Sequence, residues 1–385
     1  MIHKHIDNKT IVKLQNNYTI KRMGEDRMAS IAKYMELVNW VKEKIRRNEL
    51  KVGDKLYSEH EFSRKFQMSR QTVRHGISVL ERENIVERRQ GSGTFIKNTS
   101  LNKPNKHKNV AVVTTYVDSY IFPNIIQGIE NVTSREGYNA QISFTRNSHQ
   151  KEAEVLKNIL EKDNIDGIII ETTKSAIPNP NLHLYNEIIR RKLPILFLNC
   201  YYPQLNIPHV SMDDTEVGRT AVNYLIESGH RHIAGIFKSD DYQGYLRYSG
   251  YRKGLSHHGI KVKDENILWL DTEDQRHMED NTQRILRRLQ GCSACVCYND
   301  EVAFAIVDIC TKHGISIPEQ LSIISIDDSN LAELCEVPLT SVGYSFMEIG
   351  KTVAENLLKM IDDEDFDGRK EFEPRITVRE SVKRI

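Results

Sequence analysis

The stretch from residue 58 to residue 96 places the tightest limits on the fold of this 385-residue chain. Ser58 followed three residues later by Glu61 forms a capping box, which begins a helix. Ser69 is a favourable N-cap for a second helix after a short turn. The segment QGSG (90–93) then supplies two glycines, which permit the positive φ of a tight hairpin. Two short helices, a turn and a hairpin in this order predict an α+β winged helix-turn-helix domain that binds DNA.

The second of these helices carries side chains that suit base reading. The N-terminal residues of a recognition helix reach base edges in the major groove, where Arg can grip guanine and Gln can grip adenine. Ser and Thr beside a helix N-terminus suit contacts with phosphate, and the glycines of the hairpin let its backbone approach a groove. The residues expected at the DNA on these grounds are Ser69, Arg70, Gln71, Thr72, Arg74, Arg89, Gly91, Gly93 and Thr94.

Charge is distributed unevenly along the chain. Residues 1–98 hold 21 Lys and Arg against 12 Asp and Glu, a net charge of +9, whereas the whole chain has a net charge of only +1. A basic head on an acidic body favours a nucleic-acid module joined to a second unit. The sequence has no apolar run of about 18 residues that could cross a membrane. It also lacks the apolar segment of a signal peptide, so we expect a cytoplasmic protein.

The six cysteines all lie in the second half of the chain, and in a reducing compartment they are expected to be free thiols. The spacing Cys292-x2-Cys295-x-Cys297 leaves a metal site as an alternative, but no second ligand pair follows at the spacing of a structural zinc site. The same window alternates small apolar residues as a buried strand does, with Cys as a small hydrophobe. We therefore expect no metal and no cofactor.

From residue 110 onward, short apolar runs alternate with longer helical patterns. Examples are VAVVTTY (110–116), DGIIIE (166–171) and LSIISIDD (321–328). Strands that are apolar on both faces indicate a parallel sheet covered by helices. The number of these units fits two α/β lobes rather than one. The sequence therefore predicts a bilobal α/β domain with two parallel sheets.

Polar residues follow several of these strands. Ligand sites of α/β proteins lie at the carboxyl ends of the strands, and carboxylates, amides and a guanidinium together can satisfy the hydroxyls of a sugar. Each residue alone could instead be a capping or surface side chain, but their recurrence favours a shared cleft. The candidates are Glu171, Asn199, Arg247, Asn299 and Asp327.

Residues 31–97 resemble the winged-helix domain of the GntR family. The match runs through LKVGDKL (50–56), MSRQTVR (68–74) and GSGTF (91–95). The resemblance adds Ser58 and Glu59 to the set expected at the DNA. His75, one residue after Arg74, is a further candidate there, although a solvated side chain is an equal alternative.

Two departures from that family pattern stand out. Tyr57 occupies a position where the family usually has Pro, and His75-Gly76 occupies positions where a basic residue and Ala are usual. Glycine within a helix costs about 1 kcal/mol relative to Ala. We interpret Gly76 as a requirement for close packing.

Residues 109–385 resemble the effector domain of the LacI/GalR family. The residues that carry the likeness include SGHRHI (228–233), CYND (297–300), PEQLSII (318–324) and VRES (378–381). The resemblance implies a periplasmic-binding-protein-like fold with a ligand between two lobes. It also implies that Arg247, Asn299 and Asp327 contact the ligand, and that Asn199 stands at a position often held by Asp.

The combination of these two domains resembles the L-arabinose-responsive repressors of Gram-positive bacteria. TTYVDSYIFP (114–123), ETTKSA (171–176) and FKSDDYQG (237–244) carry this closer likeness. It implies that Tyr120, Glu171 and Lys174 lie in the pocket. Tyr120 could stack on the sugar face or could be a packing residue.

These resemblances imply a homodimeric transcriptional repressor, not an enzyme, that binds palindromic operator DNA and is released by L-arabinose as its allosteric effector. Two alternatives remain for the same parts: an activator, or a regulator that responds to another monosaccharide. A sugar-binding transport protein is a further alternative, against which the basic head and the missing signal peptide argue.

The expected organisation has four parts: a disordered tail (1–27), a winged helix-turn-helix domain (28–97), a linker (98–108) and a bilobal effector-binding and dimerisation domain (109–385). In the last of these, we expect lobe 1 to comprise about 109–210 and 344–369, and lobe 2 about 211–343 and 370–385.

Overall fold

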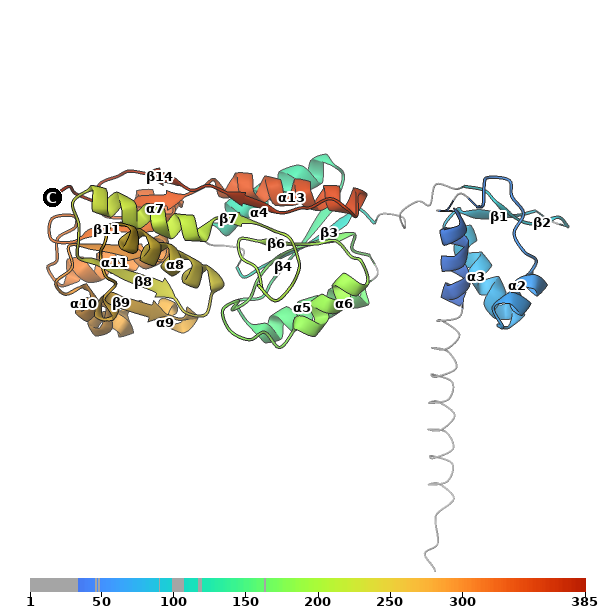
Figure 1. The fold of residues 1–385 in the computed structure, drawn as a ribbon, viewed down its shortest axis with the longest axis horizontal. Helices are drawn as coiled ribbons and strands as arrows, with labels where there is room; N and C mark the ends of the chain where they lie inside the picture. The colour runs from blue at the N-terminus through green and yellow to red at the C-terminus, as the bar shows by residue number, and fades with distance from the viewer. Residues whose placement is uncertain are drawn as a thin grey trace, which may run out of the picture. The chain divides into compact units, whose positions relative to one another are not determined.

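The computed structural model describes residues 34–45, 47, 49–89, 91–98, 107–116, 120–162 and 164–385. The chain divides into two compact units, Met1–Lys106 and His107–Ile385, which are described separately (Figure 1). The expected tail 1–27, residues 28–33 of the expected winged helix-turn-helix domain and most of the expected linker lie outside the described residues.

The first unit is a winged helix-turn-helix domain. A helix spans residues 34–45, and it is followed by α2 (Glu59–Lys65) and α3 (Arg70–Arg82). The capping box predicted at the start of α2 is present, because the Ser58 backbone N–H donates to the Glu61 carboxylate at 2.7 Å and the Ser58 hydroxyl accepts from the Glu61 N–H. Gln67 makes the turn at a φ of 48°. The three helices bury a shared apolar core that includes Leu37, Phe62, Val73, Ile77 and Leu80.

The wing is an antiparallel hairpin of β1 (Val86–Arg89) and β2 (Gly93–Ile96). Gly91 and Gly93 have positive φ angles of 73° and 120°, as the sequence predicted. Glycine adopts this conformation without the steric cost that a side chain would bring, so the hairpin needs glycine at both positions. Phe95 also forms an isolated bridge with Lys55, so the wing is tied to the segment before α2.

The second unit has two lobes, each built on a six-stranded sheet. The sheet of the first lobe has the strand order β13-β7-β6-β5-β3-β4, and every neighbouring pair in it is parallel. Its strands are β3 (Asn109–Thr114), β4 (Asn139–Phe144), β5 (Gly167–Glu171), β6 (Ile195–Leu198), β7 (His209–Met212) and β13 (Lys370–Phe372). Its helices are α4 (Phe122–Arg135), α5 (His149–Glu161), α6 (Leu182–Arg190) and α13 (Phe346–Asp362). Figure 1 shows α4 and α13 on one side of this sheet and α5 and α6 on the other.

The sheet of the second lobe has the order β14-β12-β11-β10-β8-β9, in which only β14 runs antiparallel to its neighbour. Its strands are β8 (Ile233–Lys238), β9 (Ile267–Leu270), β10 (Ala294–Cys297), β11 (Ser322–Asp327), β12 (Thr340–Gly343) and β14 (Arg375–Thr377). Its helices are α7 (Asp214–Glu227), α8 (Tyr242–His257), α9 (Thr272–Arg276), α10 (Thr282–Leu289), α11 (Asp300–Lys312) and α12 (Asn330–Leu334), with short 3-10 turns at η1 (Asp264–Asn266) and η2 (Met278–Asn281). The predicted fold class is confirmed.

The chain passes between the lobes three times, and two of the expected boundaries need correction. The first crossing follows β7, which extends to Met212 rather than ending at residue 210. The last crossing lies after residue 372 rather than before residue 370, because β13 pairs in parallel with β7 in the first-lobe sheet. β13 has only three residues, so the sequence offers little pattern from which its sheet could be assigned.

Helices α7 and α8 approach each other closely in the second lobe. A Cβ atom built on Gly218 of α7 would lie 2.0 Å from the carbonyl oxygen of Arg247, and one built on Gly250 of α8 would lie 1.9 Å from that of Thr215. Both glycines are therefore required by backbone contact. This contact fixes the position from which the Arg247 side chain enters the protein interior.

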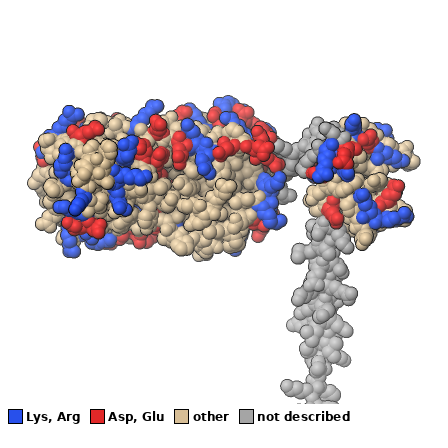
Figure 2. Space-filling model, viewed as in Figure 1, with Lys and Arg blue, Asp and Glu red and all other residues tan. Residues whose placement is uncertain are grey.

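The charged side chains are mixed on the face that Figure 2 shows. Lys and Arg alternate there with Asp and Glu on both units, so the positive charge of the head is not gathered into one patch on that face. The cysteines of β10, Cys295 and Cys297, are buried in the core of the second lobe. Among the described residues, no group of three His, Cys, Asp or Glu could hold a metal ion. None of the described helices is both long and apolar enough to cross a membrane.

Candidate functional site

A cavity of about 370 Å³ lies between the two lobes of the second unit, lined by residues of both. Glu171 ends β5, Asn199 follows β6, Tyr298 follows β10 and Asp327 ends β11. The carboxyl ends of parallel strands are the usual ligand-binding edge of α/β folds. The volume falls in the range of roughly 300–1,000 Å³ that small-molecule sites occupy. The cavity is therefore the candidate ligand site.

Five of the seven residues predicted to bind an effector line this cavity: Tyr120, Glu171, Asn199, Asn299 and Asp327. The other two, Arg247 and Lys174, are not among its lining residues. Arg247 lies behind the cavity wall, where it holds Asp327, and the Lys174 ammonium lies 4.0 Å from the carboxylate of Asp240.

Several lining residues were not predicted from the sequence. Lys238, Asp241 and Gln243 come from the end of β8 and the start of α8. The rule that found Glu171 and Asp327 also applies to Lys238, because Lys238 is the last residue of its strand. Asp241 carries a different signal, since it is the N-cap of α8 and accepts a hydrogen bond from the Gln243 N–H.

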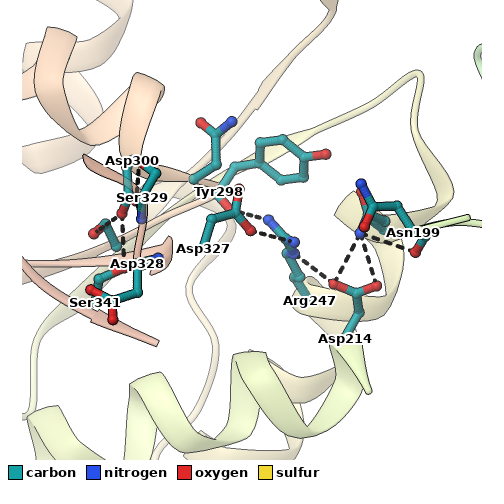
Figure 3. Close-up of polar contacts among 12 residues, drawn as sticks. Asn199, Asp214, Arg247, Tyr298, Asp300, Asp327, Asp328, Ser329 and Ser341 are labelled. Atoms are coloured by element: carbon teal, nitrogen blue, oxygen red, sulfur yellow. Dashed lines mark hydrogen bonds and ion pairs between the residues drawn. The ribbon is translucent and has the colours of Figure 1, made fainter. Parts of the chain in front are cut away.

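Arg247 is buried between two carboxylates (Figure 3). Its Nε donates to Asp214 at 2.8 Å and its Nη2 donates to Asp327 at 3.0 Å. Its Nη1 donates to the carbonyl oxygen of Tyr298 at 2.6 Å. The guanidinium therefore links the first turn of α7 to two strand ends of the second-lobe sheet, and it fixes one oxygen of Asp327.

The charges of this buried group compensate one another only in part. Burial alone would lower the pKa of Arg247, but the carboxylates of Asp327 and Asp214 outweigh it and raise that pKa well above its usual value. Burial raises the pKa of Asp214 to about 6, although Arg247 beside it acts in the opposite direction. One cation shared by two buried acids cannot fully offset the desolvation of both.

A second buried acid faces the cavity from the first lobe. The Glu171 carboxylate accepts hydrogen bonds from the Thr115 backbone N–H at 2.7 Å and from the Thr115 hydroxyl at 2.5 Å. Burial raises the pKa of Glu171 to about 7, against the lowering effect of these hydrogen bonds. Near neutral pH, Glu171 can therefore present either a carboxylate or a carboxylic acid to a ligand.

Four of the seven predicted effector residues have a left-handed backbone. The φ angles are 63° at Tyr120, 44° at Lys174, 63° at Asn199 and 101° at Asp327. Residues other than glycine rarely adopt this conformation, and such residues gather at ligand sites where the surrounding structure holds them. The strain supports a ligand-binding role for this region.

The lining offers both hydrogen-bond donors and acceptors together with aromatic faces. Such a set can satisfy the hydroxyls of a polar ligand, each of which donates and accepts. The carboxylates are Glu171, Asp241, Glu301 and Asp327; the amides are Asn199, Gln243, Gln275 and Asn299; the cations are Lys238 and Arg276; the aromatic residues are Tyr116, Tyr120, Phe122 and Tyr298. Asp300, by contrast, accepts hydrogen bonds from Ser325, Ser329 and Ser341 in the interior (Figure 3) and has a structural role.

The first unit presents the predicted DNA-contacting residues at the N-terminal end of α3. Ser69 caps this helix by accepting from the Thr72 N–H at 3.1 Å. Arg70, Gln71 and Arg74 are exposed beside it. His75 is exposed too. Its ring lies edge-on to the ring of Tyr34, with the two ring centroids 4.4 Å apart.

The remaining predicted residues lie in the wing and at the start of α2. Gly91 and Gly93 are exposed in the hairpin, Thr94 is half-buried, and Arg89 lies over the Phe95 ring at 4.6 Å. The Ser58 hydroxyl is engaged in the capping box of α2.

Two of the arginines on α3 are oriented by side chains of α2. Glu59 accepts from the Nε of Arg74 at 2.8 Å, and a ring nitrogen of His60 lies 3.2 Å from Nη2 of Arg70. These contacts hold both guanidinium groups at the exposed surface. His60 was not predicted, because nothing in its sequence position shows that it faces Arg70.

An exposed helix-turn-helix with a glycine wing, joined to a bilobal domain with a polar cavity, defines the class of transcription regulators. Residues 33–96 match the model described as bacterial regulatory proteins, gntR family. Residues 222–382 match the model of a periplasmic binding protein-like domain. A solved structure titled transcriptional regulator CelR-cellobiose complex is similar in fold, with a TM-score of 0.64 at 24% identity over 82% of this chain and 92% of that one.

Two curated relatives match almost the whole chain. The arabinose metabolism transcriptional repressor of Halalkalibacterium halodurans is 35% identical over 91% of this chain and 96% of its own length. The protein of the same name from Geobacillus stearothermophilus is 35% identical over 92% of this chain and 99% of its own length. The chain belongs to the family of arabinose metabolism transcriptional repressors. It is a transcriptional repressor and not an enzyme.

Proposed function

We propose that this repressor binds a palindromic operator as a homodimer through its winged helices, and that L-arabinose bound between the lobes of the effector domain releases it. The observation that carries the proposal is the cavity, which draws hydrogen-bonding side chains from the strand ends of both lobes. A ligand that touches both lobes stabilises one arrangement of them over the others, and this differential affinity is the physical requirement for an allosteric effector.

Recognition of a neutral sugar follows from the chemistry of the lining. Glu171 and Asp327 can accept from sugar hydroxyls, Asn199 and Asn299 can both donate and accept, and Tyr120 offers an aromatic face. These side chains come from both lobes, so a bound pentose would be enclosed rather than held on one lobe. The names of the family relatives support L-arabinose as the sugar.

The start of the effector domain offers a path from the cleft to the head. The backbone N–H groups of His107 and Asn109 donate to the two oxygens of the Asp166 carboxylate, each at 3.0 Å. Asp166 directly precedes β5, the strand that ends at Glu171 in the cavity. A movement of the first lobe on ligand binding would therefore pull the end of the linker with it, and would alter the spacing of two heads that must match two half-sites.

Calorimetry with a panel of sugars tests the effector. We expect saturable heat from L-arabinose and weaker or no heat from D-xylose, D-ribose, D-galactose and sugar phosphates. If another sugar gives heat and L-arabinose gives none, that other sugar becomes the proposed effector and the proposed site stands. Silence toward every sugar, with an intact fold, would reject the site.

Selection of binding sites from random duplex DNA tests the operator. The full-length protein should enrich an inverted repeat, and the bound duplex should be released by the sugar that gives heat. Enrichment of a single, non-repeated half-site would contradict the homodimer, and a complex that persists at saturating sugar would contradict release.

A further inference from the structure

Direct contacts join the two lobes beside the cavity, and their first-lobe residues do not line it. Asn147 Nδ2 donates to the Thr272 hydroxyl at 2.7 Å. The Ser175 hydroxyl donates to the Asp241 carboxylate at 3.0 Å and accepts from the Tyr242 backbone N–H at 2.9 Å. Asn147 and Ser175 belong to the first lobe, and neither is a lining residue of the cavity.

Both first-lobe residues dock on helix N-termini of the second lobe. Asp241 is the N-cap of α8, and Thr272 is the first residue of α9. Asn147 and Ser175 are 7% and 5% exposed, so these hydrogen bonds are shielded from water. Removing one partner of a shielded hydrogen bond costs more free energy, because the remaining polar group stays buried without a partner.

The two first-lobe loops are braced against each other. The Lys174 backbone N–H donates to Oδ1 of Asn147 at 2.9 Å, and the Thr173 hydroxyl donates to that of Thr145 at 3.0 Å. Asn147 and Lys174 both have positive φ, of 53° and 44°. These hydrogen bonds hold the two loops in one fixed arrangement, so their contacts with the second lobe are not independent of each other.

An incomplete charge contact lies at the same place. The Asp240 carboxylate is buried, and one of its oxygens accepts from the Thr272 N–H and hydroxyl, while the other has no hydrogen-bond partner among the described residues. The Lys174 ammonium of the opposite lobe lies 4.0 Å from Asp240. That distance is to Oδ2, the oxygen that already accepts from Thr272, so Lys174 adds a long ion pair across the lobes.

We infer that Asn147, Lys174 and Ser175, with their second-lobe partners Asp240, Asp241, Tyr242 and Thr272, form a latch that stabilises the closed lobes independently of the sugar and so sets the sugar concentration needed for release. This inference rests on the proposed function for its sugar response. It assigns Lys174 to the latch in place of the sugar-binding role implied by family resemblance. Asn147 and Ser175 are positioning residues, because they act on the ligand only through lobe closure.

The latch has a defined effect on affinity. The apparent dissociation constant of a ligand that needs the closed form equals the intrinsic constant divided by the closed fraction. Loss of a hydrogen bond changes the closed-to-open ratio by about five-fold. A weakened latch therefore weakens sugar binding although no atom that touches the sugar has changed.

Hydrogen exchange on the full-length, sugar-free protein tests the latch itself. Asn147→Ala should speed exchange of the Tyr242 amide several-fold, although the acceptor of that amide, Ser175, is intact. Ser175→Ala should do the same for the Thr272 amide, whose acceptor Asp240 is also untouched. Gln204→Ala, an exposed first-lobe control, should change neither. Unchanged exchange in both latch variants would overturn the inference, whatever the sugar.

Calorimetry on the same variants tests the consequence. Ser175→Ala should bind L-arabinose about five-fold more weakly than the wild type, and the double variant with Asn147→Ala more weakly still. Faster exchange combined with unchanged sugar affinity would overturn the role in setting the threshold. If the wild type itself gives no heat with L-arabinose, the proposed effector fails, and the latch is judged on the exchange data and on the sugar that does bind.

Discussion

The Tyr120 hydroxyl of the first lobe donates a 2.5 Å hydrogen bond to Asp327 of the second lobe. The same hydroxyl accepts from the backbone N–H of Asp300 at 3.3 Å. The other carboxylate oxygen of Asp327 accepts a hydrogen bond from Arg247. Burial and the charge of Asp327 raise the pKa of Tyr120 well above its usual value, so the phenol keeps its proton and remains a donor. The Tyr120 side chain thus bridges the two lobes at the wall of the cavity.

Tyr120→Phe should weaken sugar affinity by about ten-fold, because a hydrogen bond to a buried carboxylate is lost while the ring is kept. Calorimetry measures the affinity, and operator binding without sugar should stay unchanged. Tyr245→Phe, on an exposed tyrosine of α8, serves as the control. Wild-type sugar affinity in Tyr120→Phe would show that the contact does not form in solution.

Arg247→Met should lower the free energy of unfolding by about 3–5 kcal/mol, because it leaves the carboxylates of Asp214 and Asp327 buried without a cation. Arg247→Lys should cost less, since one charge remains. Urea unfolding followed by circular dichroism measures both. Arg252→Met removes an exposed cation from the same helix and should change stability by less than about 1 kcal/mol. An equal loss in the Arg247 and Arg252 variants would argue against the buried ion pairs.

Glu171 should give stability a pH dependence of defined sign. Its pKa is raised from 4.5 to about 7 in the folded protein, so the folded state binds this proton more tightly than the unfolded chain does. The stabilisation is fully present below about pH 4.5, and it is lost as pH rises through about 7. Relative to Glu171→Gln, the wild type should lose about 2 kcal/mol of unfolding free energy between pH 5 and pH 8.

Urea unfolding at the two pH values measures this difference. Glu161→Gln, at an exposed residue of α5, should track the wild type at both. A gap between wild type and Glu171→Gln that stays constant from pH 5 to pH 8 would show that Glu171 titrates at its ordinary pKa.

The sequence predicted the cavity residues that lie at the ends of strands. It did not predict the positions of side chains that depend on tertiary packing. Glu171 and Asp327 end parallel strands, whose carboxyl ends must meet at one edge of a sheet. Arg247 lies on a helix, and it enters the interior because Gly218 and Gly250 allow α7 and α8 to touch. Lys174 turns toward Asp240 through a left-handed backbone that no local pattern signals.

Arg70→Ala should weaken operator binding more than ten-fold and leave sugar affinity unchanged. Arg70 lies at the N-terminal end of α3, where side chains of a recognition helix reach base edges and a bidentate contact is worth about 1–3 kcal/mol. Arg82→Ala removes the same charge from the other end of that helix and should weaken binding less. Fluorescence anisotropy with the selected operator measures both. Equal losses in the two variants would indicate that the helix contributes charge rather than base readout.

Gly76→Ala should destabilise the head by about 1 kcal/mol, although alanine is the better helix former. A Cβ at Gly76 would lie 3.2 Å from Cδ2 of Leu37 and 3.3 Å from the Tyr34 carbonyl oxygen. Leu37 is fully buried in the core and the carbonyl belongs to a helix, so neither neighbour yields easily. Overpacking costs about 1–3 kcal/mol, which outweighs a gain in helix propensity of about 1 kcal/mol.

Fluorescence of Trp40 during urea unfolding, in a Trp269→Phe background, reports the stability of the head in this variant. Gly76→Val should cost more than Gly76→Ala, because its branched side chain meets the same two neighbours with greater volume. If Gly76→Ala proved more stable than the wild type, Leu37 would have to move aside at little cost, and close packing would not be the reason for glycine at this position.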